Sequence, residues 1–273
     1  MRYKNLMDMH THTDNSPDAV HGATLMCEHA VRRGLRAVAL TDHCECNLYI
    51  ADRYKTSVRQ AYLEAKKEKN IFAGSIIVVC GVELGQCMQN TEARDDVMAM
   101  DFDFTLGSLH NIEGQPDFYF LDFTTGELDT RAVLTAYFEQ IYSMVQWNGF
   151  DSLAHITYPF RYLPAQNIHI DPQEYRGQIM DILELLARNQ KALEINTSGR
   201  RYDADIIPPL WIVKAFKELG GRYVTVGSDA HNAEAVGSYI EDGMALAEAA
   251  GFSDVTLYQK HEPVLIPIKQ EVK

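Results

Sequence analysis

The sequence predicts a single α/β domain, residues 1–273, in which parallel strands curve into a distorted (β/α)7 TIM-like barrel. Short apolar runs that are typical of strands alternate with helical patterns along the chain. The length of 273 residues is close to the ~250 residues that such barrels usually have. No linker rich in Pro, Gly or Ser and no block of like charges divides the chain.

The predicted strands lie at residues 5–9, 36–41, 76–82, 103–107, 151–155, 192–196 and 223–227. Because helical stretches separate most of these runs, neighbouring strands should be parallel. A set of seven strands rather than eight indicates a barrel that departs from the regular form.

Three of the intervening segments carry clear helix patterns. In residues 133–147, apolar side chains recur on one stripe with the period of a helix. A second helix should follow Asp171, which is placed as the N-cap with Pro172 at the first helical position. A third should begin at the proline pair 208–209 and end at the glycine pair 220–221.

Composition and charge exclude several classes of protein. The 38 acidic residues outnumber the 25 Lys and Arg residues, and the net charge of −13 argues against a nucleic-acid partner. The chain starts without the apolar core of a signal peptide and has no apolar run of membrane-spanning length. Its five cysteines have no disulfide-framework spacing. We therefore expect a reduced, cytoplasmic protein with no membrane partner.

Potential metal ligands follow the predicted strands at their carboxyl ends. In an α/β barrel these ends meet at one mouth, where the chemistry takes place. Imidazoles and carboxylates gathered there require a cation between them. The candidate ligands are His10, His12, Asp18, His43, Glu83, His110, His155, Asp229 and His231. This set predicts a multinuclear metal hydrolase.

The spacing of these residues suits metal binding. His10 and His12 are two residues apart on an extended strand, so both side chains point to the same face. Asp229 and His231 repeat this spacing after the last strand. Glu83 follows a nearly continuous apolar strand, where a bridging role between two metals or a salt bridge with an arginine would explain it. We assign Glu83 and Asp229 to the catalytic residues as well.

Several nearby residues leave alternatives open. Either Asp18 or His21 could be the metal ligand in the loop after the first strand, and Asp18 is preferred. Cys44 and Cys46 allow a zinc–thiolate site, although the absence of a second cysteine pair downstream favours an incidental role. Asp8 is a candidate outer partner of the ligands, with a core or capping role as the alternative.

Arginines near the same mouth would recognise an anion. Arg161 and Arg200 are the predicted clamp for a phosphate or carboxylate, and the sequence does not choose between Arg200 and Arg201. A surface salt bridge explains each arginine equally well by itself. Glu45 is interpreted as a solvated loop carboxylate, with contact to a cationic substrate group as the alternative.

The ordered motifs HxH, TDH, GVE, SxH, AH and GSDAH span residues 8–231. In this order they resemble the polymerase-and-histidinol-phosphatase (PHP) family of metal-dependent phosphoesterases. The stretches EINTSGRR and HITYP are most similar to the histidinol-phosphatase branch. The chain departs from that branch at Asp18-Ala19, where His-Gly is usual.

The resemblance implies a distorted (β/α)7 barrel with three divalent metal ions, which could be zinc, iron or manganese. It implies that His10, His12, Glu83 and Asp229 bind one metal, that Glu83, His110 and His155 bind a second, and that Asp18, His43 and His231 bind a third. The implied reaction is the hydrolysis of L-histidinol phosphate to L-histidinol and phosphate, a step of histidine biosynthesis. The metals would activate water for attack on phosphorus, and no residue is assigned as the general acid.

Three other functions compete with this one. The nearest is a PHP phosphatase or phosphodiesterase that acts on another small phosphoester, such as a nucleotide or a sugar phosphate. Amidohydrolases also begin with HxH, but they usually end with a lone aspartate, whereas this chain ends with Asp229-Ala230-His231. A non-catalytic metal-binding domain should lack some ligands, and the set here is complete. The oligomeric state is left open.

Overall fold

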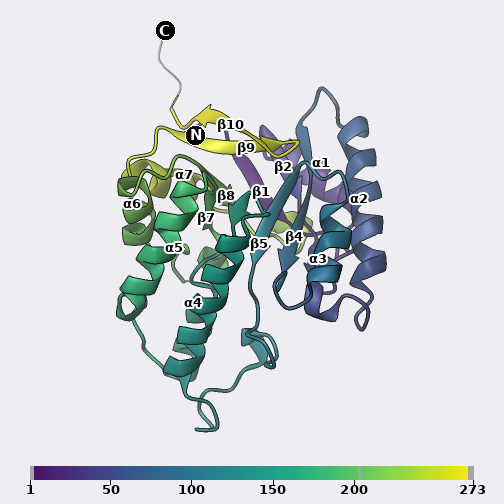
Figure 1. Ribbon diagram of the computed structural model, residues 1–273. Coiled ribbons are helices and arrows are strands. Elements are labelled where there is room, and N and C mark those ends of the chain that lie inside the picture. Colours follow the sequence, from purple (N-terminus) through teal and green to yellow (C-terminus); the bar gives the residue numbers. More distant parts are fainter. Residues whose placement is uncertain (1–2, 203, 270–273) are drawn as a thin grey trace.

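A parallel sheet that curves into a nearly closed barrel forms the centre of the molecule (Figure 1). The computed structural model describes residues 3–202 and 204–269. The sheet has the order β1-β2-β4-β5-β6-β7-β8, with β3 paired to β4, and every pairing is parallel. The strands are β1 (Met7–Thr11), β2 (Ala37–Leu40), β3 (His43–Glu45), β4 (Ile77–Gly85), β5 (Phe104–Ser108), β6 (Ser152–Leu153), β7 (Ala192–Asn196) and β8 (Val224–Gly227).

The segment that follows β8, the last strand of the barrel, is hydrogen-bonded to β1 and brings the barrel close to closure. The backbone N–H of Asp229 donates to the carbonyl of His10, and the N–H of His12 donates to the carbonyl of Ala230, both at 2.8 Å. These bonds confirm the predicted distorted barrel.

A short strand, β3, was not predicted. It continues the line of β2 beside β4, after a break at Thr41 and Asp42. The side chains at these two positions bond to the end of β1 and to the residues that follow it. Thr41 Oγ1 donates to the carbonyl of Thr11, and Asp42 accepts the backbone N–H of Thr13.

Helices cover the outer face of the sheet (Figure 1). They are α1 (Ala23–Arg32), α2 (Tyr54–Ile71), α3 (Thr91–Met98), α4 (Thr130–Trp147), α5 (Arg176–Arg188), α6 (Leu210–Glu218) and α7 (Ile240–Ala249). Short 3-10 turns lie at Cys46–Leu48, Phe118–Phe120, Tyr158–Arg161, Pro164–Gln166, Pro172–Tyr175, Ser198–Tyr202 and Ala233–Ala235. The predicted apolar stripe of α4 is fully buried at Leu134, Phe138 and Ile141.

The three predicted helices are confirmed, with one difference in the second. Asp171 accepts the backbone N–H of Gln173, as an N-cap does. The residues it caps form the 3-10 turn Pro172–Tyr175, and α5 follows directly from that turn.

A C-terminal β-hairpin, which the sequence did not predict, lies across one end of the barrel (Figure 1, yellow). Its antiparallel strands are β9 (Asp254–Gln259) and β10 (Glu262–Pro267). The backbone N–H of His261 donates to the carbonyl of Asp103, just before β5, at 2.8 Å. Tyr258 donates to the carbonyl of Asp151, just before β6, at 3.3 Å. The hairpin therefore covers the amino-terminal ends of the strands, opposite the end where the candidate ligands lie.

The described residues share one hydrophobic core, formed between the sheet and its helices. Within residues 3–202 and 204–269, no helix combines the length and the apolar character that crossing a membrane requires.

Candidate metal centre

Four of the candidate ligands meet where β1, β4 and β8 end. The extended backbone of β1 directs His10 and His12 to the same face of the sheet, as their spacing predicts. Nε2 of His10 lies 3.2 Å from Oε2 of Glu83, and Nε2 of His12 lies 3.5 Å from the same oxygen. Asp229 follows β8, and its Oδ1 lies 3.3 Å from Nε2 of His12. These four residues form a first group.

The other oxygen of Glu83 faces a second group. Oε1 lies 2.9 Å from Nε2 of His155 and 3.1 Å from Nε2 of His110. The two imidazole nitrogens are 3.4 Å apart. Because Glu83 is fully buried, its carboxylate lies between the two groups and can bridge them.

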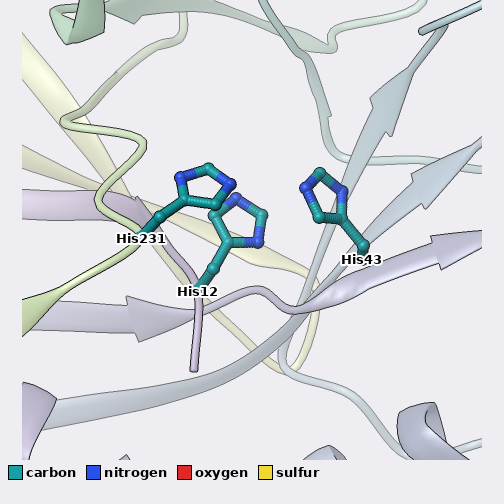
Figure 2. A group of neighbouring side chains, drawn as sticks. All are labelled: His12, His43 and His231. Carbon is teal, nitrogen blue, oxygen red and sulfur yellow. The ribbon is translucent and has the colours of Figure 1, made fainter. Parts of the chain in front are cut away.

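Asp18, His43 and His231 form a third group, beside the first. Oδ2 of Asp18 lies 3.0 Å from Nε2 of His231 and 3.7 Å from Nε2 of His43. Figure 2 shows the rings of His12 and His231 lying close together, with His43 facing the same space from another element. The ring centroid of His12 is 4.2 Å from that of His43 and 4.3 Å from that of His231.

Asp18 and His21, the two candidates for the loop ligand, have different surroundings. Asp18 is in contact with His43 and His231, as described above. His21 instead accepts the backbone N–H of Ala233 at Nδ1, at 3.0 Å. The structure therefore places Asp18, and not His21, beside the other candidate ligands.

Burial and mutual charge strongly shift the pKa values in these groups. Burial by itself would raise the pKa of Glu83, but the neighbouring His10 and His43 lower it to well below its usual range. Burial, with the charges of His43 and His231, lowers the pKa of His12 well below its ordinary value. The Glu83 carboxylate is therefore ionised and the His12 imidazole is neutral, which are the states that bind a metal. Burial would lower the pKa of His10, but Glu194 and Glu83 raise it well above its ordinary value, so a bound metal would displace a proton from this imidazole.

The donor atoms fit metal ions. Nε2 of His12 and Nδ1 of His43 are buried and make no hydrogen bond to the described residues. Two ligands about 2.1 Å from a tetrahedral metal lie about 3.4 Å apart, close to the separations within these groups. Among the described residues, three sets of ligand atoms could hold a metal ion, namely His12–His43–His231, His10–His12–Glu83 and His43–Glu83–His110. Imidazole and carboxylate donors suit zinc, iron and manganese.

Carboxylates outside these groups orient the imidazoles. Oε1 of Glu194, on β7, lies 2.6 Å from Nδ1 of His10. The sequence analysis missed Glu194, although a glutamate inside the apolar run ALEIN could have indicated it. Glu45 was expected to be solvated, but it is buried, and its Oε1 lies 2.9 Å from Nδ1 of His110. The error arose because β3, which positions Glu45, was not predicted.

Asp8 does not contact a candidate ligand side chain within the described structure. It accepts the backbone N–H groups of Ser228 and Gly237, at 2.8 and 2.7 Å. Asp8 therefore fixes the turn after β8, which is the capping role that the sequence left open.

The predicted arginine clamp divides into two different environments. Arg161 lies beside the first group, with Nη1 3.8 Å from Oδ2 of Asp229 and Nη2 donating to Ser198 Oγ at 3.0 Å. The structure does not bring Arg200 to the site, because its exposed side chain pairs with Asp242 at 3.6 Å. Arg201 lies closer, but it donates to the backbone carbonyl of Asp229 at 2.8 Å. Of these three arginines, Arg161 is therefore the one whose guanidinium lies beside the first group without pairing to a backbone carbonyl or to a distant carboxylate.

The cysteines do not form a metal site in the part of the chain that is described. Cys44 and Cys46 are buried free thiols. Its hydrogen bond with Cys44, together with burial, raises the pKa of the Cys46 thiol far above its usual value. Neither thiol belongs to a group of side chains that could hold a metal ion.

Known proteins resemble this chain in sequence and in fold. The PHP domain matches residues 8–198. A protein of Clostridium acetobutylicum is 26% identical over 254 residues, 92% of this chain and 96% of that protein. One of Thermotoga maritima is 29% identical over 240 residues, 88% of this chain and 90% of that protein. Both bear the name “Probable histidinol-phosphatase”.

A solved structure has the same fold. It is histidinol phosphate phosphatase from Lactococcus lactis, complexed with zinc, L-histidinol and phosphate. The TM-score is 0.79 at 24% identity, over 96% of this chain and 99% of that chain. With a family match over more than half of its length, this chain belongs to the PHP-domain family.

Proposed function

We propose that this protein is a metal-dependent phosphatase that hydrolyses L-histidinol phosphate to L-histidinol and phosphate. The observation that carries the proposal is the position of Glu83, whose two oxygens lie 3.2 Å from His10 and 2.9 Å from His155. A carboxylate that faces imidazoles on both sides is suited to bridging two metal ions. Multinuclear sites of this kind are typical of enzymes that cleave phosphoesters.

Three divalent ions, of zinc, iron or manganese, would fit the three groups. His10, His12, Glu83 and Asp229 would hold one, Glu83, His110 and His155 a second, and Asp18, His43 and His231 a third. When bound, such ions polarise phosphoryl oxygens and lower the pKa of coordinated water. The residues would keep such ions close together, because eight of the nine come from strand ends or the turns that follow them.

Arg161 would bind the phosphate. Its Nε is buried without a hydrogen-bond partner among the described residues, and a phosphate oxygen would satisfy it. The ring of Tyr158 lies 5.0 Å from the guanidinium carbon and keeps the side chain in place. A charged donor that is already in position can lower the barrier by about 3 kcal/mol.

Phosphate release from a panel of monoesters tests the substrate. The names of the relatives favour L-histidinol phosphate, and a nucleotide or a sugar phosphate is the alternative. We expect kcat/KM for L-histidinol phosphate to exceed that for the other monoesters at least tenfold. A higher value for a nucleotide or sugar phosphate would reassign the substrate while leaving the phosphatase proposal in place. No release from any ester by the metal-loaded protein would exclude the activity.

A further inference from the structure

The buried carboxylate of Glu194 contacts both of the groups that share Glu83. Glu194 lies on β7 and is 1% exposed. Oε1 lies 2.6 Å from Nδ1 of His10, which belongs to the first group. Oε2 accepts the backbone N–H of His155, which belongs to the second group, at 2.8 Å. One side chain therefore connects a residue on each side of Glu83.

The contact with His10 determines which imidazole nitrogen faces the site. A carboxylate oxygen can only accept a hydrogen bond, so Nδ1 of His10 must carry the proton. Nε2, which a bound metal would deprotonate, then faces the space beside Glu83 and Asp229, at 3.2 and 3.7 Å. An outer carboxylate of this kind orients a histidine and strengthens it as a ligand.

The contact with His155 stabilises the turn that follows a short strand. β6 contains only Ser152–Leu153, and the chain turns at His155 with a φ of +22°, which is unusual for a residue other than glycine. The Glu194 side chain accepts the backbone N–H of His155. This bond holds the turn in which Nε2 of His155 lies 2.9 Å from Glu83.

The surroundings of Glu194 contain little positive charge. Among the described residues, its one ion pair is with His10, and its remaining partner is Nδ2 of Asn196, at 3.3 Å. A buried carboxylate without Lys or Arg is unfavourable unless other groups compensate it. Metal ions held by His10 and by His155 would supply that compensation.

We propose that Glu194 is a positioning residue that orients His10 and His155 and so strengthens metal binding in both groups. The inference rests on the proposed metal centre. It concerns a residue whose described hydrogen bonds are with His10, His155 and Asn196, so metal affinity rather than activity is the decisive measurement.

The test compares Glu194→Gln with Glu184→Gln, a matched change on the exposed face of α5. Zn²⁺ affinity is measured by competition with a chromophoric chelator, and the Co²⁺ absorption spectrum reports ligand geometry. For Glu194→Gln we expect Zn²⁺ binding to weaken about 10- to 100-fold and the Co²⁺ bands to change. For Glu184→Gln we expect both to match the wild type.

The outcomes separate this role from the proposed function. A wild-type chain that binds no Zn²⁺ overturns the metal centre and this role with it. Equal Zn²⁺ affinity in wild type and Glu194→Gln overturns the role alone. A lower melting temperature of metal-free Glu194→Gln, with unchanged Zn²⁺ affinity and an unchanged Co²⁺ spectrum, also overturns it. If Glu194→Gln does not fold, Glu194→Asp keeps the charge on a shorter side chain. It should bind Zn²⁺ at least threefold more weakly, and unchanged binding overturns the role.

Discussion

Nε2 of His155 lies 2.9 Å from Oε1 of Glu83, while the other oxygen of that carboxylate faces His10 at 3.2 Å. A single side chain thus joins two groups of candidate ligands. Its removal should affect both groups together, whereas removal of one histidine should affect mainly one of them.

Replacement of Glu83 by Gln should therefore remove more than one metal equivalent and lower kcat/KM by at least 10³-fold. The amide keeps the shape of the side chain but loses the charge that compensates the cations. Metal content after dialysis and phosphate release are the measurements. Glu92→Gln, on the exposed face of α3, is the control and should resemble the wild type. Full metal content in Glu83→Gln would contradict a bridging role.

The two arginines of the predicted clamp should behave differently. Arg161→Ala should lower kcat/KM about 10²-fold, because its guanidinium lies beside Asp229 and would contact the phosphate. Arg200→Ala should change it less than about threefold, because that side chain is exposed and paired with Asp242. Initial rates with L-histidinol phosphate distinguish the two. A large loss in Arg200→Ala with a normal Arg161→Ala would reverse the assignment.

Removal of metal should destabilise the fold as well as abolish activity. Without cations, the buried carboxylates and imidazoles lose their strongest partners. A ligand present at 100 times its Kd adds about 2.7 kcal/mol of stability, or roughly 5–10 °C in a chain of this size. Thermal unfolding before and after chelation measures this difference. Zn²⁺ or Mn²⁺ should restore the melting temperature, and Ca²⁺, which prefers oxygen ligands, should not. Restoration by Ca²⁺ alone would argue against an imidazole-rich site.

The backbone at Gly227, on β8, leaves room for the His10–Glu194 pair. A Cβ atom added there would lie 2.4 Å from Cβ of His10 and 2.8 Å from Oε1 of Glu194. Gly227→Ala should therefore displace His10 and weaken Zn²⁺ binding at least tenfold. Gly177→Ala, where an added Cβ meets no atom within 4 Å, is the control. Chelator competition measures both, and normal binding in Gly227→Ala would mean that the strand moves without disturbing the site.

The strand ends that carry the candidate ligands could be predicted, because short apolar runs ending in His, Glu or Asp are visible in the sequence. The environment of Glu45 could not be predicted, because its burial depends on β3. The three residues of this strand, His43–Glu45, form no apolar run. The choice between Arg200 and Arg201 depends on the direction of a 3-10 turn, Ser198–Tyr202, that no periodicity encodes. Glu194 was missed because its partners are distant in the sequence, with His10 184 positions away.

The C-terminal hairpin was missed for a similar reason. Its strands are stabilised by contacts with the beginnings of β5 and β6 rather than by a pattern of their own. In β10, Val264 and Leu265 are both partly exposed, so the alternation that identifies a strand is weak there.

The hairpin also predicts a pH dependence of stability. Nδ1 of His261, between β9 and β10, lies 2.8 Å from Oδ2 of Asp151. The hydrogen bond to Asp151 raises the pKa of His261 above 6.5, although burial opposes the shift. Lys191 also opposes the shift, while Asp103 adds to it. Because the folded pKa exceeds the unfolded one, the stabilisation is complete below about pH 6.5 and is lost as the pH rises through the folded value.

His261→Gln keeps a hydrogen-bonding side chain and removes the charge, so it should lower the urea midpoint at pH 5.5 and have little effect at pH 9. The effect should be modest, because the His261 side chain is 43% exposed and solvent screens the pair. Comparing wild type and variant at each pH cancels the pH dependence of metal binding, which both share. His169→Gln, at an exposed position, should show no difference at either pH. An equal loss at pH 5.5 and pH 9 would mean that His261 stabilises the hairpin by packing, and not by its charge.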